Sequence, residues 1–121
     1  MFELLINLLP IALLFIVCDL PWLYASSSTV LPMIKKIQGG APLEMRWGAA
    51  VPVYLALAYL IQVSKSTAEA GLIGLSTYAV YDFTNLSTLT NYTLEFAVAD
   101  SLWGGMLFMI VRELGLRLGL L

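Results

Sequence analysis

The chain has 121 residues, of which 60% are hydrophobic and only 12% are charged, and its formal net charge is −2. A soluble domain would carry about a quarter charged residues, so this chain lacks the polar surface that a globule needs in water. The composition predicts a membrane protein, and the slightly acidic balance offers no basic patch for nucleic acid. The absence of histidine excludes His-based nucleophilic pairs and His-ligated metals, and a single cysteine, Cys18, excludes an internal disulfide.

Four apolar segments follow one another along the chain, and about 20 apolar residues suffice to cross the hydrocarbon core. We therefore predict an all-α fold, a four-helix transmembrane bundle in one domain covering residues 1–121, with both termini on one side of the membrane. The first segment is predicted to be a retained span, because the residues before it include an acid and no basic residue. The predicted spans are 4–24, 47–63, 68–86 and 94–111.

The longest predicted connection, residues 25–46, has an apolar stretch of its own. This stretch predicts a short interfacial helix, capped by the Ser/Thr run at 26–29, with Lys35, Lys36 and Gln38 facing the headgroups. Its apolar face would consist of Val30, Leu31, Met33, Ile34 and Ile37. Gly39 and Gly40 are expected to end it. An irregular loop over the same residues is the alternative. Basic residues are nearly balanced between the two predicted sides, so the positive-inside rule sets no orientation.

Aromatic residues gather near the predicted span ends. Such positions are typical of the belts that anchor membrane proteins at the lipid–water interface. The sequence therefore predicts that most of five aromatic residues are interfacial anchors: Trp22, Tyr24, Trp47, Tyr92 and Trp103.

Three aspartates, Asp19, Asp82 and Asp100, lie within the predicted spans. A carboxylate at bilayer depth costs about 2.5–3.5 kcal/mol on insertion scales, so each needs compensation. With alternating span directions and a rise of about 1.5 Å per residue, all three are predicted to lie in the same half of the bilayer. Intramembrane acids are either polar links that fix helix register or a functional site, and both interpretations stay open here.

Helical spacing places polar and small residues on shared faces around these acids. In the first and fourth spans the pattern D-x-x-W recurs, as Asp19 to Trp22 and Asp100 to Trp103, so each indole is expected to shield or bond the acid of its own helix. Ala70 and Gly74 form a small-xxx-small pair that permits close helix approach. The predicted faces are Phe15, Asp19 and Trp22 in the first span; Gly74, Tyr78, Tyr81, Asp82 and Asn85 in the third; and Asp100, Trp103, Gly104 and Phe108 in the fourth.

No lysine or arginine lies at the same depth to pair with the acids. One or more carboxyl groups are then protonated, or water or a bound cation compensates, or side-chain donors do; the kind of metal is left open. Pro21 also removes a helix bond to the carbonyl of Val17, which becomes a candidate acceptor near Asp19. The candidate side-chain donors are Tyr78, Tyr81, Thr84, Asn85, Trp22 and Trp103.

The run Tyr81-Asp-Phe-Thr-Asn-Leu-Ser-Thr-Leu89, with Asp100-Ser-Leu-Trp-Gly104 downstream, resembles a family of small four-span predicted membrane proteins of unknown function. That family is marked by YDxTNLxTL and DxxWG. The resemblance covers nearly the whole chain and carries no established activity. The chain departs from the common pattern at Ser87 and in the loop at 90–92. The motif set that the resemblance implies is Asp19, Trp22, Tyr81, Asp82, Thr84, Asn85, Asp100, Trp103 and Gly104.

Three functions remain open at this level. The first is a structural or accessory subunit, or partner-binding element, within a larger membrane complex or homo-oligomer. The second is a carrier or channel for protons or a small cation that uses Asp19, Asp82 and Asp100. The third, a lipid-modifying enzyme, is disfavoured because no D-D-x-x-D, H-x-x-x-H or nucleophile motif is present. No catalytic residue and no cofactor are implied, and the bilayer is the one partner that the composition predicts.

Overall fold

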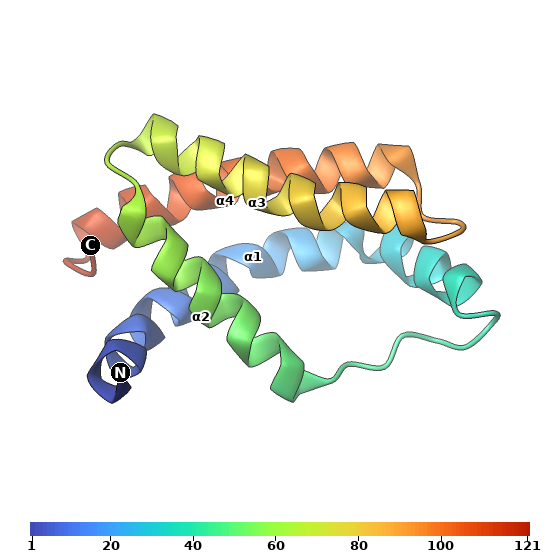
Figure 1. The fold of residues 1–121 in the computed structure, drawn as a ribbon, viewed down its shortest axis with the longest axis horizontal. Coiled ribbons are helices and arrows are strands. Elements are labelled where there is room, and N and C mark those ends of the chain that lie inside the picture. Colours follow the sequence, from blue (N-terminus) through green and yellow to red (C-terminus); the bar gives the residue numbers. More distant parts are fainter.

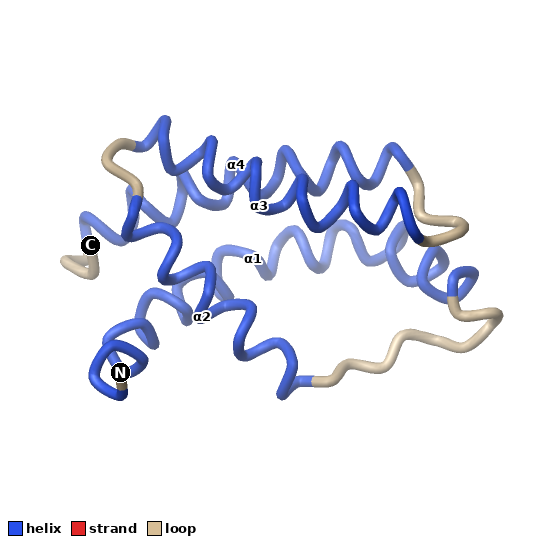
Figure 2. The backbone as a smooth tube through the Cα atoms, viewed as in Figure 1, coloured by secondary structure: helices blue, strands red, loops and turns tan.

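The computed structural model describes all 121 residues as four helices joined by three connections. The helices are α1 (Phe2–Ile37), α2 (Trp47–Val63), α3 (Thr67–Thr88) and α4 (Leu94–Arg117). Figure 2 shows that helices make up most of the chain and that the longest connection joins α1 to α2. The predicted all-α, four-helix architecture is confirmed. Three helices begin within one residue of the predicted segments, and α4 runs six residues further than 94–111.

Helix α1 differs most from the prediction, because the expected break after Tyr24 does not occur. Residues 25–37 are neither a loop nor a separate interfacial helix; they continue the same 36-residue helix. The Ser/Thr run does not cap a new helix, since the Ser27 hydroxyl donates to the carbonyl of Tyr24 within the existing one (2.7 Å). The helix ends where predicted, at Gly39 and Gly40, both of which have positive φ.

Three prolines lie inside α1 at intervals of eleven residues, Pro10, Pro21 and Pro32. Eleven residues make about three turns, so all three lie on one side of the helix, and all three are exposed. Each removes a backbone hydrogen bond, and prolines are the commonest cause of helix kinks. Figure 1 shows the result: α1 changes direction along its length rather than running straight.

Helices α3 and α4 pack together as an antiparallel pair, α1 runs along α4 in the opposite direction, and α2 crosses α1 obliquely (Figure 1). Both chain termini and the α2–α3 turn lie at one end of the molecule, and the α3–α4 turn and the end of α1 lie at the other. Side-chain caps begin two helices: Ser66 accepts the Glu69 N–H and Thr93 accepts the Phe96 N–H. Arg112 ties α4 to the α2–α3 turn by donating to the Ser64 carbonyl (2.8 Å).

The interior has two apolar cores with a polar layer between them. The larger core contains residues from all four helices, among them Phe15 and Phe108, whose rings meet edge to face at 5.0 Å. The smaller core is formed by Met33, Tyr92 and Ala97 near the α3–α4 turn. The three aspartates, all buried, lie along the chain between these two sets of residues. The acids are therefore built into the interior and are not exposed to lipid.

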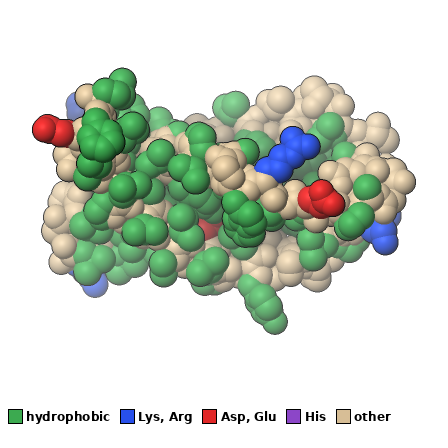
Figure 3. All heavy atoms as spheres, turned by 90° about the horizontal axis from the view of Figure 1, so that it is seen from below, with side chains coloured by type: hydrophobic (Ala, Val, Ile, Leu, Met, Phe, Trp, Pro, Cys, Tyr) green, Lys and Arg blue, Asp and Glu red, His purple; other side chains and the backbone are tan.

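The surface is dominated by apolar side chains. Figure 3 shows one face on which hydrophobic side chains cover the left part and the centre, with one basic and one acidic side chain to the right of the centre and other charged side chains near the two ends. Helices α1 and α4 are long and apolar enough to cross a membrane, and α2 is a shorter apolar helix of 17 residues.

Candidate functional site

The two D-x-x-W motifs bond to each other across α1 and α4. Trp103 Nε1 donates to Asp19 Oδ1, and Trp22 Nε1 donates to Asp100 Oδ1, each at 2.8 Å. Because the helices are antiparallel, equal spacing within each motif brings each indole opposite the acid of the other. The two indoles stack between the acids, with centroids 5.7 Å apart and planes 18° apart. The prediction that each indole donates its N–H to the acid of its own helix is therefore wrong.

Asp19 has a second donor on α2. The Tyr54 hydroxyl donates to Asp19 Oδ2 at 2.8 Å, so both oxygens of this carboxyl group are bonded. Hydrogen bonds to a charged group are worth about 1.5–3 kcal/mol each, enough to offset much of the cost of a buried carboxylate. Asp19 thus links three helices, since its donors come from α2 and α4 while it belongs to α1.

Asp82 on α3 is 0% exposed and has a different environment. The Tyr92 hydroxyl, from the α3–α4 turn, donates to Asp82 Oδ1 at 2.6 Å. The Asp100 carboxyl and the Ser101 hydroxyl, both on α4, are neighbours of Asp82, although the Ser101 hydroxyl donates to the carbonyl of Ala97. Burial and the bond to Asp82 raise the pKa of Tyr92 above its ordinary value, which keeps this hydroxyl a donor. The name aspartate layer is used below for Asp19, Asp82 and Asp100 with their donors Trp22, Tyr54, Tyr92 and Trp103.

The structure does not bring every predicted residue into the aspartate layer. Tyr81 is 61% exposed, and Thr84 is exposed as well. Successive helix residues are rotated by about 100°, so Tyr81 lies a quarter turn from Asp82 and Thr84 lies on the opposite side of α3.

Asn85 is half-buried beside the hydroxyls of Tyr81 and Tyr92. Tyr78 is half-buried among the three acids. Of the predicted α3 donors, Tyr78 and Asn85 lie at the layer, and Tyr81 and Thr84 face outward.

The carbonyl of Val17 is not part of the layer either. Val17 and Pro21 are both exposed, so the carbonyl that Pro21 leaves free lies on the outer side of α1, while Asp19 faces the interior. The predicted aromatic belt also fails for Trp22, Tyr92 and Trp103, which face inward as donors to the acids. Tyr24 and Trp47 stay exposed, as interfacial anchors would.

Small residues hold α3 and α4 in close contact, as the small-xxx-small pattern predicts. Ala70 and Gly74 are buried against α4. A Cβ atom at Gly74 would lie 2.3 Å from the carbonyl oxygen of Gly104, and one at Gly104 would lie 2.2 Å from Cγ of Tyr78. Both distances are far below contact, so only glycine fits. This close approach places Asp82 beside Asp100.

Two donors of the aspartate layer were missed by sequence reasoning. Tyr54 is the only tyrosine in the middle of α2 (Tyr59 lies further on and is exposed), and a phenol deep in an apolar helix usually seeks an acceptor. A tyrosine at this position therefore predicts a hydrogen bond, but it does not predict which residue accepts it. Tyr92 was assigned to the interface because of its position near a span end, and its 7% exposure shows the opposite orientation.

Replacing Tyr54 with phenylalanine tests the link between α2 and α1. The ring keeps its packing, and only the hydrogen bond to Asp19 is lost. We expect a destabilisation of about 1.5 kcal/mol, the lower limit for a hydrogen bond to a charged group. The lower limit applies because Trp103 still donates to Asp19. The free energy of unfolding in detergent micelles is the measurement. Tyr24→Phe is the matched control, because Tyr24 is 85% exposed and should leave stability unchanged. Equal effects of the two substitutions would contradict the link.

Comparison with known proteins gives a family and no activity. Residues 4–116 match the family described as "Predicted membrane protein (DUF2177)". A search of curated proteins and a search of solved structures found no match. The matched segment includes all four helices almost completely and every residue of the aspartate layer. The chain therefore belongs to the DUF2177 family of predicted membrane proteins.

Proposed function

We propose that all four helices cross the bilayer and that the protein is an accessory subunit, which packs against a transmembrane helix of a larger membrane assembly. The alternation of chain ends and turns between the two ends of the molecule supports four crossings, as does the apolar middle in Figure 3. Helix α2, with 17 residues, reaches the lower limit of about 17 residues for a span. The aspartate layer then acts as an internal brace that fixes how these helices are arranged.

The observation that carries the accessory role is the exposure of the first half of α2, residues 47–56. The buried residues of α2, Leu57, Ala58 and Ile61, all lie in the second half. In the first half, Tyr54 and Leu55 pack against the core but are only partly buried. This half carries no charge, and a Cβ atom at Gly48 would meet nothing within 4 Å. Small residues on transmembrane helices let a neighbouring backbone approach closely. An uncharged surface with small residues suits an apolar transmembrane helix of a partner protein.

A photo-crosslinking amino acid at Val51 of α2 tests this role in native membranes. The matched control is Leu102 on α4, because both side chains are 57% exposed and apolar. We expect a discrete protein adduct from Val51 and only lipid adducts from Leu102. Lipid adducts at both positions would contradict a partner on α2. An adduct of twice the chain mass would contradict the accessory role and show a homo-oligomer instead.

A second function, a carrier or channel for protons or a small cation, is favoured by one observation. Oδ2 of Asp82 is buried and has no hydrogen-bond partner, although the other carboxyl oxygen is bonded. An ionisable side chain within a membrane span is by default a hypothesis for a functional site, such as a proton relay or an ion pathway. In vesicles containing the purified protein, this function predicts a pH-dependent flux that Asp82→Asn abolishes. Unchanged leakage in the wild-type and variant vesicles would remove it.

A further inference from the structure

Asp82 has one carboxyl oxygen that is buried and accepts no hydrogen bond. Its Oδ1 accepts from Tyr92, whereas Oδ2 is buried without a partner. The Asp100 carboxyl is its neighbour across the close α3–α4 contact, but two carboxylates can only accept, so neither can satisfy the other. A buried, unsatisfied charged oxygen costs several kilocalories per mole, which makes a doubly ionised pair the least stable arrangement.

We propose that Asp82 and Asp100 form a buried acid pair that binds one proton between their carboxyl groups. The proton resides on Asp82 Oδ2 and is donated to Asp100, whose Oδ1 is already taken by Trp22. Binding changes the charge of the pair from −2 to −1, and no bond between heavy atoms forms or breaks. One proton thereby satisfies the orphaned oxygen and removes the repulsion between two charges.

The groups that face the pair favour a proton over an ion pair or a metal. The ionisable side chains that interact with it are acids and tyrosines, and none is basic. Calcium and magnesium take six or more oxygen ligands, and no group of three or more acidic side chains lies close enough together to hold a metal ion. The ionisable groups that face the pair are Tyr92 from the α3–α4 turn, Tyr78 and Tyr81 from α3, and Asp19 from α1; Ser101 on α4 adds a hydroxyl.

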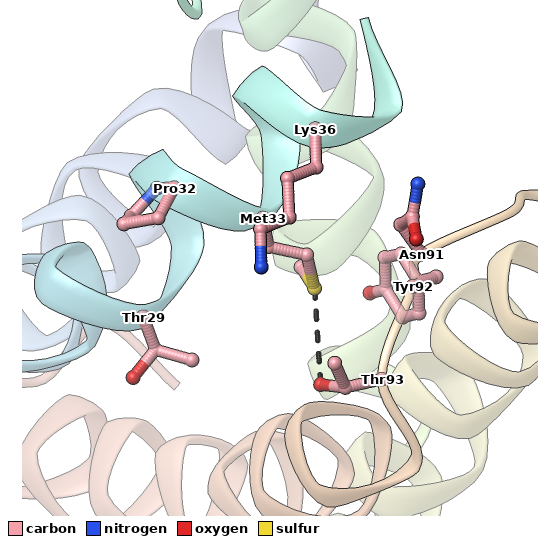
Figure 4. A pocket seen from close by; sticks show the side chains of 7 residues that line it. All are labelled: Thr29, Pro32, Met33, Lys36, Asn91, Tyr92 and Thr93. Carbon is pink, nitrogen blue, oxygen red and sulfur yellow. Dashed lines mark hydrogen bonds between the residues drawn. The ribbon is translucent and has the colours of Figure 1, made fainter. Parts of the chain in front are cut away.

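A surface groove gives this proton a route to solvent. The groove, about 290 Å³, lies between the last turns of α1 and the α3–α4 turn, with Met33 and Lys36 on one side and Asn91, Tyr92 and Thr93 on the other (Figure 4). Tyr92 lines the groove and also donates to Asp82, so a single hydroxyl separates the pair from it. Its oxygen can accept a proton from a hydronium ion in the groove while its own proton passes to Asp82 Oδ1. Rotation of the Asp82 carboxyl group then turns the protonated oxygen toward Asp100.

Infrared spectroscopy of the full chain in vesicles of neutral phospholipid tests the acid pair. At neutral pH we expect the carbonyl band of one protonated carboxylic acid per chain. Asp82→Asn and Asp100→Asn should each abolish this band, because an amide at either position donates as the proton would. Glu95→Gln, which removes an exposed acid in the first turn of α4, should leave it unchanged. Tyr92→Phe should keep the band and slow its exchange with deuterium.

The result that overturns the acid pair is a wild-type spectrum without the band, or a band that persists in both amide variants. Helical circular dichroism of each variant shows whether it has folded, and either amide variant alone is sufficient for the test. This inference does not depend on the accessory role; it supplies the site that the carrier function needs. Proton binding is measured without transport, so a band without flux retains the pair and removes only the carrier.

Discussion

Replacing Trp22 with phenylalanine is expected to destabilise the fold by about 2 kcal/mol, the middle of the range for a hydrogen bond to a charged group. Interhelical hydrogen bonds in membrane proteins average about 0.6 kcal/mol, but those are mostly between neutral groups. Here the indole N–H is the donor to a buried carboxyl oxygen of Asp100. Trp103→Phe should cost less, because Asp19 keeps the bond from Tyr54.

Leucine at Trp22 and Trp103, singly and together, removes the aromatic rings, and the unfolding free energies of these variants in detergent micelles form a double-mutant cycle. Because the indoles of Trp22 and Trp103 stack, the cycle should reveal a favourable coupling of about 0.5–1.5 kcal/mol, the range for aromatic pairs. Trp47→Phe is the control, since Trp47 is exposed and should change nothing. Additive effects in the cycle, or a Trp22 variant as stable as the control, would contradict the reciprocal bonding.

Substituting alanine for Gly104 is expected to cost about 3 kcal/mol, the upper part of the range for overpacking a well-filled interior. The added methyl group would lie 2.2 Å from Cγ of Tyr78, at the root of a ring that cannot swing away without leaving the interface. The helices α3 and α4 would have to separate, which would also move Asp82 away from Asp100. The stability measurement is again unfolding in micelles.

Gly48→Ala is the matched control for Gly104→Ala, because both glycines are helical and Gly48 has open space around it. Alanine favours a helix over glycine by about 1 kcal/mol, so this control should be neutral or slightly stabilising. The opposite signs of the two substitutions would then separate close packing from helix propensity. A Gly104 variant as stable as the Gly48 variant would show that α3 and α4 are not in the close contact described here.

The length of the apolar runs predicted the four helices, because long apolar runs leave little choice of secondary structure. It also predicted that Asp19, Asp82 and Asp100 lie near one another in depth, because alternating helix directions set depth from residue number. The error in α1 has a physical cause: serine and threonine hydroxyls can bond within a helix as well as cap one. Membrane thickness, which set the predicted limit of the first span, does not limit how long a helix can be.

The sequence did not predict which side chain of one helix bonds which aspartate of another. A single helix shows which residues share its face, but not the rotation or register of the helix opposite. Two equal D-x-x-W spacings allow reciprocal bonding only in the register that places Trp103 beside Asp19 and Trp22 beside Asp100. The role of Tyr54 depends in the same way on the oblique crossing of α2, which no local pattern encodes.

The central claim is that the acids of α1 and α4 are bonded by each other's tryptophans, and solid-state NMR in lipid bilayers measures this most directly. With ¹⁵N-labelled indoles and ¹³C-labelled aspartate carboxyls, the dipolar couplings identify which nitrogen lies beside which carboxyl group. The structure predicts strong couplings from Trp103 to Asp19 and from Trp22 to Asp100, because each indole nitrogen is 2.8 Å from a carboxyl oxygen. Couplings confined within each motif, Trp22 to Asp19 and Trp103 to Asp100, or no coupling at all, would contradict it.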